Sequence, residues 1–258
     1  MLLTILFPAL AGLLVLAVRN STARAFIAIL GTLGNFALAA KLFGLVRSGA
    51  PMGFSAPWAF QMDFALKLGN LGAFIMLAAA GFGLLVVLYS WQFMESHKHA
   101  GVFSFLLLVT LALLNGAVMA DHLIVLLFFW EGMLGALFGM IAIGRPGAWK
   151  TATKALIIAG VTDLCLMLGI ALVRYLSPTM LMSELAVHPL ETSGLGTLAF
   201  ILLMIGAISK GGSMPFHSWI PDAAVDAPLP FMIFLPASLE KLLGIFFLLF
   251  GFFFHLVQ

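Results

Sequence analysis

The sequence predicts an all-α polytopic membrane protein with about eight transmembrane helices. Hydrophobic residues make up 63% of its 258 residues and charged residues 9%, whereas a soluble domain has about 25% charged residues. The apolar residues are grouped in stretches of the length that crosses a bilayer, about 20 residues of α-helix. Ionisable side chains nevertheless lie inside several of these stretches. We therefore expect a multi-pass protein of the cell (inner) membrane, in contact with the lipid bilayer.

The composition argues against several other classes of protein. The formal net charge is only +2, so nothing indicates nucleic-acid binding. The single cysteine, Cys165, cannot by itself hold an iron–sulfur cluster or a structural zinc. No His, Asp and Glu cluster has the spacing of metal ligands, and no glycine-rich phosphate loop follows a strand. We therefore expect this chain to bind no cofactor and to catalyse no reaction alone.

Eight apolar segments have the length and composition of membrane spans. The first lacks the basic start and the cleavage site of a signal peptide, so we expect a retained helix. Of the links, residues 47–70 predict a small extramembrane hairpin, and residues 175–195 predict an extramembrane loop with room for one helical turn. The expected spans are residues 2–18, 25–46, 71–91, 102–120, 122–143, 150–174, 196–218 and 228–254.

Four charged residues lie near the middle of expected spans: Glu131, Asp163, Lys210 and Lys241. Each such placement costs roughly 2.5–3.5 kcal/mol on the insertion scale. An ionisable group inside the membrane can bind and release a proton, and a role in proton transfer would explain why such costly residues are present. Structural roles stay open as well. Glu131 can pair with a helix neighbour, Asp163 can form a salt bridge between helices, and Lys210 can snorkel to the surface.

The residues beside two of these lysines predict irregular helices. Lys210 is followed by two glycines and Pro215, which interrupt helices. Irregular backbone at membrane depth occurs only inside protein or beside a watery cavity, and broken helices build ion sites in transporters. Pro236 precedes Lys241 by five residues and predicts a kink there. We therefore expect the seventh span to break between Lys210 and Pro215.

Four short runs resemble motifs of one family, the antiporter-like, proton-translocating subunits of respiratory complex I, Mrp-type cation/proton antiporters and membrane-bound hydrogenases. The run from Lys210 to the sequence Met-Pro-Phe-His-Ser-Trp-Ile-Pro-Asp-Ala is similar to the helix 7 motif and is the most specific match. The others resemble the helix 4–5 signature and the start of helix 8. The four runs are residues 120–123, 129–131, 210–223 and 227–241.

The resemblance implies roles for the buried charges. Glu131 matches a helix 5 glutamate that is paired with a helix 7 lysine, here Lys210. Lys241 matches the helix 8 lysine that passes protons toward the central hydrophilic axis. Asp163 is similar to a helix 6 aspartate of one branch, and His217 belongs to the helix 7 motif. We therefore expect these five residues to form a proton-translocation path.

The resemblance also implies an organisation in two parts. Residues 1–100 correspond to transmembrane helices 1–3 with the extramembrane hairpin. Residues 101–258 correspond to an antiporter-like five-helix proton-channel unit, helices 4–8, with a broken helix 7. Family members carry this unit and an inverted copy, whereas this sequence holds one. Glu240 beside Lys241 differs from the complex I versions and favours the hydrogenase-like relatives.

The favoured interpretation is a membrane subunit of a redox-driven complex that translocates protons, or sodium ions, through a half-channel of buried Glu and Lys residues. Two alternatives stay open: a non-conducting structural subunit of the membrane arm, and an independent cation/proton antiporter. The buried charges argue against the first, and the single unit argues against the second, because alternating access normally uses two repeats. The expected partners are other membrane subunits of a complex I-like or hydrogenase-like oxidoreductase, including a chain that supplies the second half-channel.

Overall fold

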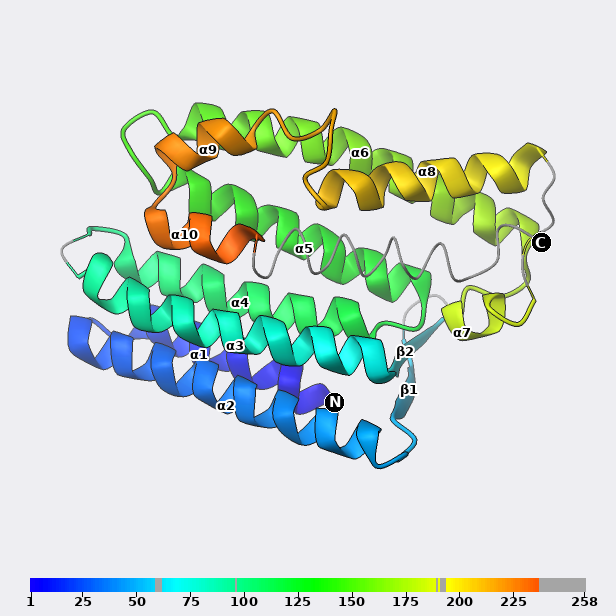
Figure 1. The fold of residues 1–258 in the computed structure, drawn as a ribbon, viewed down its shortest axis with the longest axis horizontal. Coiled ribbons are helices and arrows are strands. Elements are labelled where there is room, and N and C mark those ends of the chain that lie inside the picture. Colours follow the sequence, from blue (N-terminus) through cyan, green and yellow to red (C-terminus); the bar gives the residue numbers. More distant parts are fainter. Residues whose placement is uncertain (59–61, 96, 189, 191–193, 237–258) are drawn as a thin grey trace.

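The helices of the protein lie side by side with their axes roughly aligned (Figure 1). The computed structural model describes the whole chain except residues 59–61, 96, 189, 191–193 and 237–258. In chain order the elements are α1 (Leu2–Ala17), α2 (Ser21–Arg47), β1 (Gly53–Pro57), β2 (Asp63–Lys67), α3 (Asn70–Phe93), α4 (Ala100–Met119), α5 (Leu123–Ala142), α6 (Trp149–Leu176), α7 (Met182–Leu185), α8 (Gly194–Lys210), α9 (Ile220–Asp226) and α10 (Leu229–Phe234).

Five of these helices, α2 to α6, are long and apolar enough to cross a membrane, while α1 and α8 are apolar but shorter. The first six expected spans agree with α1 to α6 to within four residues at each end. For the seventh, residues 196–218, the structure shows α8 ending at Lys210, and the break of one membrane span into two parts stays a prediction. The eighth, residues 228–254, extends beyond the described residues, so the count of eight spans stays a prediction.

The segment that predicted a hairpin does form one. Strands β1 and β2 pair antiparallel, with Gly53 opposite Lys67. Phe64 of β2 packs edge-to-face against Phe129 of α5, with 6.1 Å between the ring centroids. The backbone N–H of Asp121, just before α5, donates to the carbonyl of Ala65. The hairpin therefore lies at the end of the bundle where α5 begins, next to the single helical turn α7 (Figure 1).

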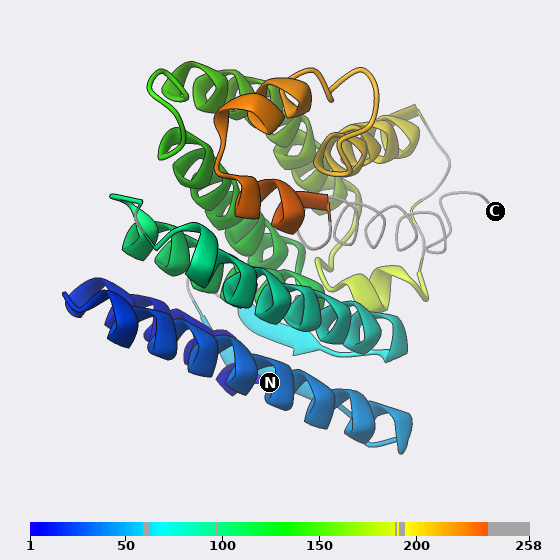
Figure 2. The ribbon, with the colours of Figure 1, turned by 60° about the vertical axis from the view of Figure 1, so that its left-hand side comes forward.

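Helix α4 lies at the centre of the bundle, where it packs against α1, α3 and α5. Figure 2 shows α1 and α2 along one edge of the molecule and α6 and α8 along the opposite edge. Many large apolar side chains on the outer faces, such as Leu3, Leu85 and Leu164, are more than half exposed. A membrane protein presents such a surface to lipid, because lipid tails are as apolar as the side chains.

A buried polar contact replaces a backbone hydrogen bond that is missing from α1. Pro8 has no backbone N–H, so the carbonyl of Thr4, four residues earlier, lacks its helical donor. Asn115 of α4 supplies one: its Nδ2 donates to the Thr4 carbonyl at 2.7 Å and to Asn35 Oδ1 of α2 at 2.8 Å. This contact joins three helices within the apolar interior.

Helix α6 provides the frame for the remaining elements. Its 28 residues span about 42 Å, more than the roughly 30 Å of bilayer hydrocarbon. Helix α8 packs along α6 and ends part-way along it (Figure 1). Between α8 and α9 the chain makes turns, with Gly212 at a φ of 63° that favours glycine. Helix α9 then lies near the start of α6, where Thr151 Oγ1 donates to Asp226 Oδ2 at 2.6 Å.

Candidate functional site

A buried ion pair joins α6 and α8 in the middle of the bundle. Lys210 Nζ lies 3.7 Å from Asp163 Oδ2, and the two side chains are 11% and 3% exposed. Lys210 is the last residue of α8, and Asp163 lies 14 residues after the start of α6 and 13 before its end. This places Asp163 about 20 Å from each end of α6. Because α6 is long enough to cross a bilayer, the pair lies near the middle of that crossing.

Trp130 of α5 contacts both members of this pair. Its indole N–H donates to Asp163 Oδ1 at 2.7 Å. The Lys210 ammonium lies 4.8 Å from the centroid of the indole ring, within the range of a cation–π interaction. Trp130 is 1% exposed. Three helices, α5, α6 and α8, therefore contribute side chains to this site. Nothing in the sequence indicated this role of Trp130.

A second polar contact fixes how α8 lies on α6. The hydroxyls of Thr162 and Ser209 lie 2.7 Å apart, and both side chains are buried. Each of them immediately precedes one member of the ion pair, Asp163 or Lys210. Separating the two helices would cost the buried Ser209 hydroxyl this partner, whereas Thr162 Oγ1 also lies 2.8 Å from the carbonyl of Ala159. The contact therefore resists sliding or rotation of α8 relative to Asp163.

Glu131 lies close to the ion pair but is not a member of it. It is half-buried, and its Oε1 is buried without a hydrogen-bond partner among the described residues. It is coupled electrostatically to the like charge of Asp163 and to the opposite charge of Lys210. The expected ion pair between Glu131 and Lys210 was therefore wrong as a direct contact. The reason is the packing order: α6 packs against both α5 and α8, so its own carboxylate meets the lysine.

The structure does not join the other two expected path residues to this pair. His217 lies in the turns between α8 and α9, and its Nδ1 is buried without a hydrogen bond within the described ranges. Lys241 lies outside the described residues. The path through all five residues therefore stays a prediction, and only Glu131, Asp163 and Lys210 come together among the residues that the structure describes.

A more exposed ion pair holds α9 to α6. Lys154 Nζ lies 2.7 Å from Asp222 Oδ2, and the two side chains are 42% and 48% exposed. The same ammonium also donates to the carbonyl of Ser218 at 2.8 Å. Lys154 precedes Asp163 by nine residues, which is about 13 Å along α6. The chain from Lys210 to Asp222 therefore runs along α6 from its middle toward its start.

A separate group of titratable residues lies where α5 begins. The buried side chain of His122 caps α5 by accepting the backbone N–H of Ile124 at its Nδ1. The carboxylate of Asp121 accepts both the N–H and the O–H of Ser183, which fixes the segment of α7. Burial lowers the pKa of His122 below its usual value, and the carboxylates of Asp63 and Asp121 act in the opposite direction. His122 therefore favours the neutral form that capping requires.

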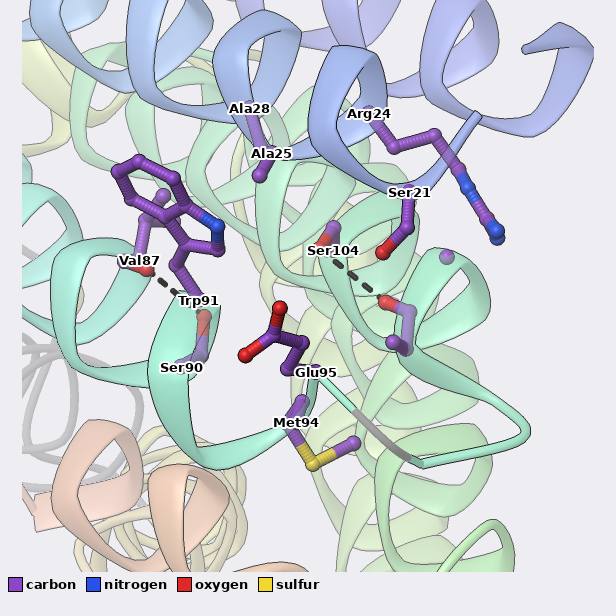
Figure 3. Close-up of a pocket in the computed structure, with 12 residues that line it drawn as sticks. Ser21, Arg24, Ala25, Ala28, Val87, Ser90, Trp91, Met94, Glu95 and Ser104 are labelled. Carbon is purple, nitrogen blue, oxygen red and sulfur yellow. Dashed lines mark hydrogen bonds between the residues drawn. The ribbon is translucent and has the colours of Figure 1, made fainter. Parts of the chain in front are cut away.

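One cavity lies outside this region, between the start of α2, the end of α3 and the start of α4 (Figure 3). It has a volume of about 30 Å³, enough for roughly one water molecule. Glu95 points into it in Figure 3. The hydroxyls of Ser90 and Ser104, on either side, donate to carbonyls of their own helices. The cavity is therefore a water-sized space at one end of the bundle rather than a part of the buried pair.

Comparison with known families and proteins gives the following similarities. Residues 120–258 match the family described as NADH:quinone oxidoreductase/Mrp antiporter, TM. The Na(+)/H(+) antiporter subunit A1 of Staphylococcus aureus strain JH9 is 33% identical over 183 residues, which are 69% of this chain and 23% of that protein. The subunit A1 of strain Newman matches to the same extent. The chain thus spans about a quarter of the length of these curated relatives.

Solved structures share the fold. A chain of the membrane-bound sulfane sulfur reductase (MBS), an archaeal respiratory membrane complex, superposes with a TM-score of 0.84 at 21% identity, covering 93% of this chain and 50% of that one. A chain of respiratory complex I from Thermus thermophilus with bound Aureothin gives a TM-score of 0.79 at 21% identity, covering 96% and 52%. The fold of this chain therefore corresponds to about half of each solved chain.

Proposed function

We propose a function from the premise that this chain belongs to the NADH:quinone oxidoreductase/Mrp antiporter family of membrane proteins. It is an antiporter-like membrane subunit, and we infer that it translocates protons or sodium ions within a redox-driven complex of the cell membrane. The observation that carries the proposal is the buried pair of Asp163 and Lys210 at the end of α8, half-way along α6.

The geometry of this pair suits the transfer of a proton. A hydrogen-bonded charge pair has an N to O distance of about 2.7–2.9 Å, whereas Lys210 Nζ and Asp163 Oδ2 are 3.7 Å apart. Neither atom makes a hydrogen bond among the described residues. The pair is thus held by its charges, and the facing atoms are open to a water molecule or a proton. Glu131, coupled to both, is the nearby group to exchange with.

We propose that α8 and α9 are two parts of one broken membrane span, the seventh. The two cross-contacts to α6 support this: Lys210 faces Asp163 at the middle of α6, and Asp222 faces Lys154 about 13 Å nearer its start. The turns between them then lie at membrane depth. The C-terminal end of a helix is the negative end of its dipole, which favours the Lys210 cation there.

A complete path needs further groups. In this proposal residues 101–258 form one proton-channel unit, and Lys241 receives the proton from Lys210. The chain corresponds to about half of each solved chain, so polar groups outside these 258 residues complete the route across the membrane. Other membrane subunits of a complex I-like or hydrogenase-like assembly are the proposed partners, and we propose that this chain itself holds no cofactor.

The names of the curated relatives favour a second candidate function. Because the curated relatives at 33% identity are named Na(+)/H(+) antiporter subunits, the chain can equally serve a complex that exchanges cations for protons without a redox step. The same buried pair would serve either complex, since both move a proton through the membrane. The driving force therefore distinguishes the two candidates.

The test uses membrane vesicles that contain the assembled complex, with a pH-sensitive dye inside. We expect proton movement on addition of respiratory substrate in the first case and on addition of NaCl alone in the second. Lys210→Met and Asp163→Asn should abolish the movement while the complex still assembles. Lys67→Met, on the exposed strand β2, is the matched control and should leave it unchanged. Assembled Lys210→Met vesicles that move protons at the normal rate would contradict the proposal.

A further inference from the structure

We propose that Trp130 is a positioning residue that aligns the carboxylate of Asp163 with the ammonium of Lys210. The inference rests on the function proposed above, since a charged pair matters for transport only if the pair takes part in it. It concerns a neutral side chain that makes a direct contact with each of the two charges, from a third helix.

The first step is the indole N–H. It donates to Asp163 Oδ1 at 2.7 Å, the length of a charge-assisted hydrogen bond. Because Oδ1 is occupied in this way, the carboxylate presents its other oxygen, Oδ2, to Lys210. Trp130 thus fixes the orientation of the Asp163 carboxylate.

The second step is the indole ring. Lys210 Nζ lies 4.8 Å from the ring centroid, and the negative face of an indole attracts an ammonium most strongly where water is excluded. The ring therefore helps to hold the Lys210 ammonium beside Asp163. Since Nζ has no hydrogen bond among the described residues, this contact acts together with the charge of Asp163 at 3.7 Å.

The third step is the place of Trp130 in the bundle. It is fully enclosed at 1% exposure, and it directly precedes Glu131, which is coupled to both members of the pair. Trp130 therefore keeps Asp163 and Lys210 aligned with one another while Glu131 approaches from the same helix. A change in the indole therefore alters the alignment of the pair without removing either charged side chain.

The test separates the N–H from the ring. Replacement of Trp130 by its benzothienyl isostere keeps the shape and removes only the N–H, so the fold is retained. Trp130→Leu removes both. We expect the isostere to lower the rate of proton movement about tenfold, the usual size of a lost hydrogen bond to a charge, because Asp163 Oδ2 is no longer held toward Lys210. Trp130→Leu should lower the rate further, because the contact of the ring with the Lys210 ammonium is lost as well.

A readout independent of transport is the infrared stretch of the Asp163 carboxylate, identified by its loss in Asp163→Asn. The frequency of this band should differ between the isostere and the wild type, because the carboxylate loses the indole N–H at Oδ1. Trp219→Phe, which alters another buried tryptophan, is the control and should leave the band unmoved. A band of identical frequency with and without the N–H overturns the inference. A shifted band in a protein that moves no protons would reject the proposed function and keep the positioning role.

Discussion

Asp163 of α6 and Lys210 of α8 face one another at 3.7 Å, at the point where one helix is at its midpoint and the other ends. A charge in the middle of a long apolar helix is costly unless it is paired. Lys210 neutralises the Asp163 carboxylate and lies at the negative end of the α8 dipole, which favours a cation there.

The first prediction concerns the stability of this pair. Lys210→Met should destabilise the folded protein by about 3–5 kcal/mol, because it leaves the Asp163 carboxylate buried without its partner. Thermal unfolding in detergent measures the loss. Lys154→Met, which breaks the half-exposed pair with Asp222 on the same helix, should cost less than about 1 kcal/mol.

The double variant Asp163→Leu/Lys210→Met removes both charges and should be more stable than Lys210→Met alone. Additive losses at the two positions would mean that the two side chains do not interact.

The second prediction concerns pH. Burial lowers the pKa of His122 from its ordinary value of 6.5, so the unfolded chain binds the proton more strongly than the folded one. The stability that neutral His122 contributes is therefore complete above that value and declines as the pH falls toward the folded-state pKa. His122→Asn keeps a capping acceptor without titrating, and should flatten this decline in melting temperature measured from about pH 8 to pH 5.

The exposed His188 offers the control for this prediction. His188→Asn should retain the wild-type dependence of melting temperature on pH. An equally steep acid decline in His122→Asn would assign the pH dependence to other groups.

The third prediction tests the close approach of two loops. A Cβ at Gly144, between α5 and α6, would overlap the backbone carbonyl oxygen of Asp226 at the end of α9. Gly144→Ala should therefore cost about 1–3 kcal/mol of stability. Gly160→Ala, where α6 leaves open space around the glycine, should be neutral or stabilise by about 0.5–1 kcal/mol. The measurement is the melting temperature of each variant in the same detergent. Similar melting temperatures for the two variants would contradict the close approach of Asp226 to Gly144.

The fourth prediction couples a proline to an asparagine. Asn115→Ala leaves the Thr4 carbonyl without a donor and should cost about 1–3 kcal/mol. Pro8→Ala restores a backbone N–H for that carbonyl. The loss from Asn115→Ala should therefore be smaller in the Pro8→Ala background than in the wild type, as measured by a double-mutant cycle of unfolding. Equal losses in both backgrounds would show that the Thr4 carbonyl does not depend on Asn115.

Much of the fold could be predicted from residue order, because its signals are local. A membrane span needs a run of apolar residues, and that run is visible in the sequence whatever lies around it. The same holds for the hairpin at residues 53–67, whose alternation of polar and apolar residues is a property of each strand. The candidate charges inside spans were also visible, since each departs from its apolar surroundings.

The sequence alone thus determined that this is a helical membrane protein and which charges interrupt its apolar stretches. Only the tertiary structure decided which charges meet. Lys210 faces Asp163 rather than Glu131 because α6 packs between α5 and α8, and that packing order depends on side chains far apart in the chain. Trp130 was missed for the same reason: a tryptophan in an apolar helix looks like a packing residue until its N–H is seen to meet a carboxylate 33 residues away.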